Sequence, residues 1–181
     1  MGDLDDRAGR MAPRSSESGE RVRLYSFCMS NVRPIPEGFN TLTPYLIVDG
    51  ADDAIAFYQK ALGAEVVDVS KMPDGKVMNA QLRIGNSMLM LNDEWPEYGA
   101  IGPKKVGNTS VTIHMYVEDV DAAWQRAVDA GMEVSMPLGD QPWGDRYGSL
   151  KDPYGHSWSM ATHKEEVSQE EFMERMSQMG G

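Results

Sequence analysis

Residues 53–66 read DAIAFYQKALGAEV, and residues 121–134 read DAAWQRAVDAGMEV. Each stretch begins with Asp-Ala, carries apolar residues at helical spacing and ends in Gly-x-Glu-Val. A glycine in this place is typical of a helix C-terminus, because it adopts the left-handed backbone with which many helices end. The recurrence of the pattern indicates an internal duplication, so we expect two copies of one helix-to-strand unit.

A β-prone run comes before each helix, FNTLTPYLIV at residues 39–48 and SVTIHMYV at residues 110–117. Tight-turn residues such as Pro-Asp-Gly and Gly-Asn divide the sequence after the first helix into short apolar segments, and the second copy is divided in the same way. We therefore predict three strands after each helix. The predicted fold class is α+β, with two βαβββ modules at residues 39–93 and 109–163 of one domain, 39–163.

Residues 1–28 hold five acidic residues and five arginines without helical or strand periodicity. Such a composition favours a disordered leader, and Met29 is then a candidate start of translation. The single cysteine, Cys28, has no partner for an internal disulfide and no zinc-finger spacing. We assign it no role.

Residues 164–181 are expected to carry a short C-terminal helix. Ser168 and Glu171 have capping-box spacing, and Phe172, Met173 and Met176 follow at helical intervals. The sequence predicts an amphipathic helix that packs on the body of the protein or on a partner.

Composition excludes several classes of partner. The chain has 181 residues, 41% of them hydrophobic, which is enough for a folded core. No apolar run reaches the length of a membrane span or forms a signal peptide, so we expect a cytoplasmic protein with no membrane partner. A formal charge of -11 argues against nucleic acid, because binders of phosphate backbones need clustered Lys and Arg.

The stretches PYLIVDGADDAIAFYQKALGAEVV (44–67) and HMYVEDVDAAWQRAVDAG (114–131) resemble the vicinal oxygen chelate superfamily, which includes glyoxalases, bleomycin-resistance proteins and extradiol dioxygenases. The run WGDR (143–146) and the ending DPYGHSWSMATH (152–163) are similar to its PhnB-like branch. The resemblance implies a glyoxalase-like fold in which each module curls into a half-open cup, with the ligand inside and the helices outside. It also implies a homodimer.

Catalytic members of the superfamily hold a divalent metal on the first and last strands of each module. The resemblance carries these metal positions onto four residues of this chain: Thr43, Leu89, Thr112 and Ser159. None is a good ligand for such an ion, and Ser159 stands where a glutamate is usual. We therefore predict no metal and no other cofactor. A relocated site that uses His114, with His156 and His163 nearby in sequence, stays open.

Candidate ligand contacts come from both modules. Three candidates lie at the entry to the seventh strand, where a loop can close over a cup: Trp143, Arg146 and Tyr147. The planar guanidinium of an arginine can form two parallel hydrogen bonds with a carboxylate or a phosphate. On the second module His114, Tyr116 and Trp158 are further candidates. On the first module the candidates are Asn79, Gln81 and Met90. Each of these residues also has a plain structural explanation in core packing or surface ion pairs.

On the third strand, Asn79, Gln81 and Arg83 share one face, and Met78, Ala80, Leu82 and Ile84 share the other. Whichever of these faces lies inward decides whether the cup is polar or apolar.

These residues favour a small-molecule-binding protein of the glyoxalase and bleomycin-resistance type, which binds or sequesters an organic ligand without a metal. Two other functions are compatible with the sequence. One is a metal-dependent lyase, isomerase or dioxygenase, which needs ligands beyond those found. The other is a non-catalytic scaffold or regulatory protein. Because no catalytic triad order or phosphate-binding loop is present, we name no catalytic residue.

Overall fold

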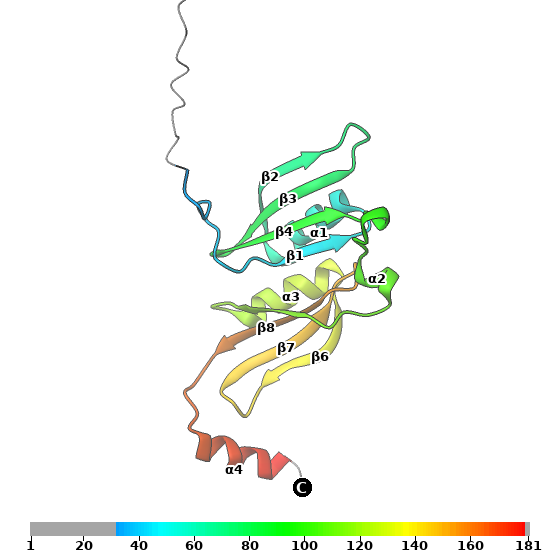
Figure 1. Ribbon diagram of the computed structural model, residues 1–181. Helices are drawn as coiled ribbons and strands as arrows, with labels where there is room; N and C mark the ends of the chain where they lie inside the picture. The colour runs from blue at the N-terminus through cyan, green and yellow to red at the C-terminus, as the bar shows by residue number, and fades with distance from the viewer. Residues whose placement is uncertain (1–31, 180–181) are drawn as a thin grey trace, which may run out of the picture. The chain divides into compact units, whose positions relative to one another are not determined.

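The computed structural model describes residues 32–179 (Figure 1). The expected leader, Cys28 and Met29 all lie outside this range. The chain divides between residues 33 and 34, and every element below belongs to the unit Pro34–Gly181.

The first module contains β1 (Tyr45–Val48), α1 (Ala51–Leu62), β2 (Glu65–Lys71), β3 (Val77–Ile84) and β4 (Ser87–Asp93). The connection holds two short helices, η1 (Pro96–Tyr98) and α2 (Pro103–Val106). The second module contains β5 (Thr112–Tyr116), α3 (Val120–Ala130), β6 (Glu133–Asp140), β7 (Asp145–Lys151) and β8 (Ser157–His163), and α4 (Gln169–Met179) follows it.

The two sheets have the same topology. Their strand orders are β1-β4-β3-β2 and β5-β8-β7-β6, with β1 parallel to β4 and β5 parallel to β8. All other neighbouring strands are antiparallel. The predicted α+β fold of two βαβββ modules and a short C-terminal helix is confirmed.

The helix ends follow the glycines of the repeated motif. Gly63 closes α1 with a φ of 67°, and Gly131 closes α3 with a φ of 113°. At the other end of α3, the side chain of Asp119 accepts a hydrogen bond from the backbone N–H of Ala122. Both helices therefore end at the glycine of the motif, and α3 also begins at a capping aspartate.

One face of each sheet is covered by its helix, as Figure 1 shows. In the first module Ala80 and Leu82 of β3 are fully buried in the core with Tyr58 of α1. Asn79 and Gln81 point the other way and are half-buried. The face that the helix leaves open therefore carries Asn79 and Gln81 and is the polar one. Met78 departs from the predicted alternation: it is 50% exposed and does not share the buried face, because the β2–β3 register shifts beside it.

The turn between β7 and β8 ties the two modules together through Asp152. Its carboxylate is 4% exposed and accepts hydrogen bonds from the hydroxyl of Tyr58 at 2.6 Å and from the indole N–H of Trp158 at 2.8 Å. It also accepts the backbone N–H groups of Tyr154 and His156. Burial and the nearby Asp152 carboxylate raise the pKa of Tyr58 well above its ordinary value, so its hydroxyl remains a donor.

The C-terminal helix α4 has the predicted capping box. The hydroxyl of Ser168 accepts from the backbone N–H of Glu171, and the carboxylate of Glu171 accepts from the N–H of Ser168. Met173 and Met176 are 61% and 44% exposed. No helix between residues 32 and 179 is both long and apolar enough to cross a membrane.

Candidate ligand-binding site

Four side chains with flat rings gather on the open face of the second sheet. His114 and Tyr116 are alternate residues of β5, with ring centroids 4.5 Å apart and nearly perpendicular. Tyr147 of β7 stacks beside His114 at 5.9 Å, and Trp143 meets Tyr147 edge to face at 5.7 Å. We call these four residues the aromatic cluster. Tyr116 is 64% exposed and Trp143 is 40% exposed, so the cluster presents ring surface to solvent.

The buried carboxylate of Asp145 fixes the orientation of the cluster through hydrogen bonds. Its carboxylate is 5% exposed and accepts from the indole N–H of Trp143 at 3.1 Å and the hydroxyl of Tyr116 at 3.0 Å. It also lies 2.7 Å from Nδ1 of His163. Burial alone would raise the pKa of Asp145, but the hydrogen bonds from His163, Tyr116 and Trp143 outweigh it and hold that pKa below its ordinary value. The buried group is therefore an ionised acceptor.

A glycine allows the loop to bring Trp143 to this place. Gly144 has a φ of 95°, and a Cβ there would lie 2.2 Å from the carbonyl oxygen of Glu165. The backbone N–H of Lys164 donates to the carbonyl of Gly144 at 2.9 Å. Only glycine permits both this backbone angle and this close approach, so the segment after β8 holds the β6–β7 turn next to the cluster.

His114 is held by Ser159 of β8, which lies opposite it in the parallel ladder. Nδ1 of His114 lies 2.8 Å from the hydroxyl oxygen of Ser159, which is 2% exposed. The imidazole is thereby fixed at one nitrogen, and its ring faces are left for contact with Tyr116 and Tyr147.

The four positions expected for metal ligands are spread over the two modules. Thr43 precedes β1, Leu89 is only 3% exposed in the core, and Thr112 lies opposite Ser157. Ser159 lies opposite His114, and in the first module Tyr45 lies opposite Met90. One imidazole with a phenol, a thioether and a hydroxyl does not fit a divalent metal.

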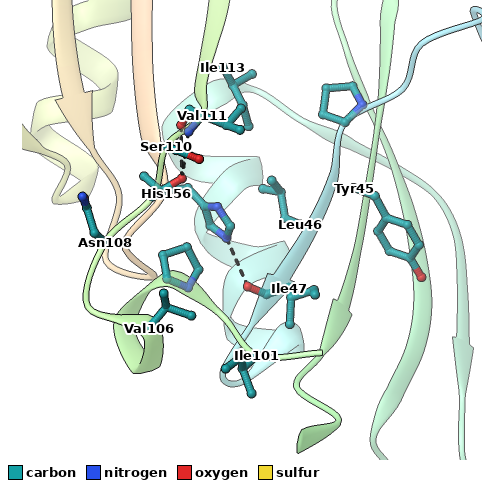
Figure 2. Close-up of a pocket in the computed structure, with 13 residues that line it drawn as sticks. Tyr45, Leu46, Ile47, Ile101, Val106, Asn108, Ser110, Val111, Ile113 and His156 are labelled. Atoms are coloured by element: carbon teal, nitrogen blue, oxygen red, sulfur yellow. Dashed lines mark hydrogen bonds between the residues drawn. The ribbon is translucent and has the colours of Figure 1, made fainter. Parts of the chain in front are cut away.

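The other two histidines have their own partners. His163 contacts Asp145, and Nε2 of His156 lies 3.1 Å from the carbonyl oxygen of Ile47 (Figure 2). Within residues 32–179 no three His, Cys, Asp or Glu side chains gather closely enough to hold a metal ion. The described residues therefore do not assemble the relocated site that the sequence left open.

The candidates of the first module lie on its own open face. Gln81 and Met90 are neighbours in the β3–β4 register, and the amide nitrogen of Asn79 donates to the hydroxyl of Tyr45 at 3.1 Å. The amide oxygen of Asn79 is buried without a hydrogen-bond partner. These residues form a polar surface separate from the aromatic cluster.

Two predicted contacts point away from that cluster. Arg146 follows Asp145 in β7 and so faces the helix side, where it pairs with Asp121 of α3 at 2.7 Å and with Asp140 at 3.2 Å. Trp158 is 1% exposed and belongs to the core, with its indole N–H on Asp152. Strand alternation explains the direction of both side chains. Arg146 lies away from the four rings, whereas Trp158 lines a cavity that His114 and Tyr116 also line.

Sequence reasoning did not select Asp145 or His163 as site residues. Asp145 lies two residues before Tyr147 in β7 and shares its strand face. The alternation of side chains along the strand is the sequence signal from which Asp145 could have been predicted as a site residue. His163 pairs with Asp145 across β7 and β8, a relation that depends on strand register and is not visible in the sequence.

Two cavities lie where the modules meet. One, of about 360 Å³, is bounded by β1, the segment that leads into β5, and His156, with apolar walls that include Ile101, Val106 and Val111 (Figure 2). The other, of about 390 Å³, is bounded by the β3–β4 turn, β5 and α3, and it reaches His114 and Tyr116. Both are within the size range of small-ligand pockets.

The fold uses one βαβββ unit twice. Comparison with known protein families identifies the family to which such a chain belongs. The chain belongs to the Glyoxalase/Bleomycin resistance protein/Dioxygenase superfamily, whose model matches residues 38–160. The expected membership of the vicinal oxygen chelate superfamily is thereby confirmed.

Among individual relatives, an uncharacterized protein of Mycobacterium tuberculosis is 46% identical over 142 residues, which cover 77% of this chain and 84% of the relative. The crystal structure of TioX from Micromonospora sp. ML1 has a TM-score of 0.56 at 25% identity, covering 68% of this chain and 98% of TioX. A PhnB protein from Bacillus cereus shares the fold with a TM-score of 0.53 at 21% identity, covering 68% and 99%.

Proposed function

We propose that the protein binds a small organic molecule with a planar, unsaturated ring system on the aromatic cluster, and that it does so without a metal ion. The observation that carries the proposal is the anchored arrangement of the four rings. Stacking on a ring needs exposed faces in a fixed orientation, and both Asp145 and Ser159 fix them through hydrogen bonds. A preorganised surface loses little side-chain entropy when a ligand binds.

The metal positions support binding over metal-assisted chemistry. Metal-dependent members of the family need several nitrogen and oxygen donors, whereas the register pairs Tyr45–Met90 and His114–Ser159 offer a single imidazole. A binding protein needs only shape, apolar area and a few polar groups. The side chains on the open faces therefore favour binding of an organic molecule over metal-assisted chemistry.

The test compares 2-naphthol with its saturated analogue 2-decalol by isothermal titration calorimetry. We expect the wild-type protein to bind 2-naphthol more tightly, because a flat ring stacks on Trp143 and Tyr147. Trp143→Ala should weaken 2-naphthol binding by about 1–2 kcal/mol, the scale of one aromatic contact with its buried area.

The control is Tyr98→Ala, which removes an aromatic side chain that is 83% exposed in η1, outside the cluster. It should leave 2-naphthol binding unchanged. Equal affinity for 2-naphthol and 2-decalol, or full binding by Trp143→Ala, would contradict the proposal.

A further inference from the structure

The cavity of about 390 Å³ has a composition of its own. Its apolar walls come from both modules and include Leu62 at the end of α1, Ile84 and Met88 beside the β3–β4 turn, and Ile113 and Met115 of β5. Trp143 and Tyr147 are not among the residues that line it. His114 and Tyr116 of the aromatic cluster do line it, so the cavity adjoins the cluster but leaves out the rings of Trp143 and Tyr147.

Arg126 is the one permanently charged side chain among the described residues that line this cavity. Its Nε donates to the carbonyl oxygen of Ala61 at 3.2 Å, which fixes the guanidinium over Gly63. A Cβ on Gly63 would lie 3.7 Å from the guanidinium carbon. Arg126 forms no ion pair with any carboxylate of residues 32–179. Its outward N–H groups remain for another acceptor.

Arg126 has no carboxylate partner among residues 32–179, although acidic residues outnumber basic residues in this chain by 28 to 17. Of the other arginines in residues 32–179, Arg83, Arg146 and Arg175 each pair with an acidic side chain, and Arg33 forms no ion pair with a described residue. Among the described residues that line the cavity there is no Asp or Glu, and the polar ones include the neutral side chains of Asn40, Asn86 and Ser87. Leu42, which also lines it, is 87% exposed and leaves apolar surface uncovered.

We infer that this cavity binds an amphipathic organic anion, with its carboxylate on the guanidinium of Arg126 and its apolar part between the two modules. An arginine matches a carboxylate with two parallel hydrogen bonds, and such charge-assisted bonds are stronger than neutral ones. The apolar walls supply the remaining affinity. The cavity shares His114 and Tyr116 with the aromatic cluster, but the inference rests on a different polar group, the guanidinium of Arg126.

The test uses 4-phenylbutanoate and its neutral amide, 4-phenylbutanamide, which differ only in the charged group. By calorimetry we expect the wild-type protein to prefer the acid by about tenfold, the lower end of what a hydrogen bond to a charged group contributes at an exposed side chain. Arg126→Gln should reduce this preference to near unity, and Arg126→Lys should retain part of it because the positive charge remains.

Arg83→Gln is the matched control, because it removes an exposed arginine that pairs with Glu65 away from the cavity. It should leave the preference for the acid unchanged, and so should Trp143→Ala. Thermal unfolding of each variant checks that the fold is intact. If the amide binds as tightly as the acid to wild-type protein, or if Arg126→Gln keeps the preference, the inference is wrong. Loss of 2-naphthol binding in Trp143→Ala tests the aromatic cluster separately.

Discussion

The two sheets have the same topology, yet their open faces carry different chemistry. In the first module Tyr45 lies opposite Met90, and Asn79 and Gln81 complete a polar surface. In the second module His114 lies opposite Ser159, beside rings oriented by the buried Asp145. The helix-covered faces are apolar in both modules. Duplication has therefore preserved what packs the core, while the open faces have diverged.

The turns that precede the last strand of each module differ in the same way. Between β3 and β4 only Gly85 and Asn86 intervene, and both line the cavity that contains Arg126. Between β7 and β8 the turn begins at Asp152, whose carboxylate reaches Tyr58 of the first module. The second module therefore supplies both the aromatic cluster and the polar link to its neighbour.

The largest expected effect comes from breaking that link. Asp152→Ala leaves the hydroxyl of Tyr58 and the indole N–H of Trp158 buried without their acceptor. We expect the free energy of unfolding to fall by about 3 kcal/mol or more, since each orphaned buried donor costs about 1–3 kcal/mol. Urea denaturation followed by circular dichroism measures it.

Asp140→Ala is the control for that change. Asp140 is an exposed carboxylate whose ion pair with Arg146 lies at the surface, so its loss should cost less than about 1 kcal/mol. A similar small cost for Asp152→Ala would show that the hydrogen bonds of Asp152 contribute little to holding the two modules together.

The fold could be predicted because its signals are local. The repeated helix with its closing glycine, the alternation in KVMNAQLRI and the turn at Pro73-Asp74-Gly75 are each visible within a dozen residues. The role of Asp152 was not predicted, because its partner Tyr58 is 94 positions away in sequence. Nothing local distinguishes a turn aspartate that holds another module from one that only closes its own turn.

The candidate site could be predicted only in part, because it depends on strand register. His114, Tyr116, Trp143 and Tyr147 were selected by residue type and place, and the structure brings them together. Arg146 was selected with them, although it is one residue from Tyr147 and alternation turns it to the other face. The cavity around Arg126 was missed, since its walls come from elements of both modules.

A smaller effect is expected from the charge state of His163, which contacts the anchor of the cluster. The hydrogen bond to Asp145, with a further contribution from Glu166, raises the pKa of His163 above its ordinary value of 6.5. A histidine whose pKa is higher in the folded state than in the unfolded chain stabilises the folded protein. This stabilisation is fully present at pH values below the pKa of the unfolded chain. The contribution is lost as pH rises through the folded pKa.

Urea denaturation between pH 6 and pH 9 should therefore show wild-type stability declining relative to His163→Gln, which cannot acquire the charge. The difference between the two proteins should be largest at the acidic end of that range. A constant difference across the series would mean that protonation of His163 does not stabilise the folded protein. Glu118→Gln, an exposed substitution in the same module, should run parallel to the wild type.

The smallest effect is expected on the open face of the first module. Asn79→Ala removes one hydrogen bond to Tyr45 and also a buried amide oxygen that has no partner. The two changes oppose each other, so we expect the free energy of unfolding to shift by less than about 1 kcal/mol. Binding of 2-naphthol should stay within about twofold of wild type, because no aromatic contact is lost. If Asn79→Ala weakens 2-naphthol as strongly as Trp143→Ala does, the first module contributes directly to the binding surface and the contrast between the two open faces fails.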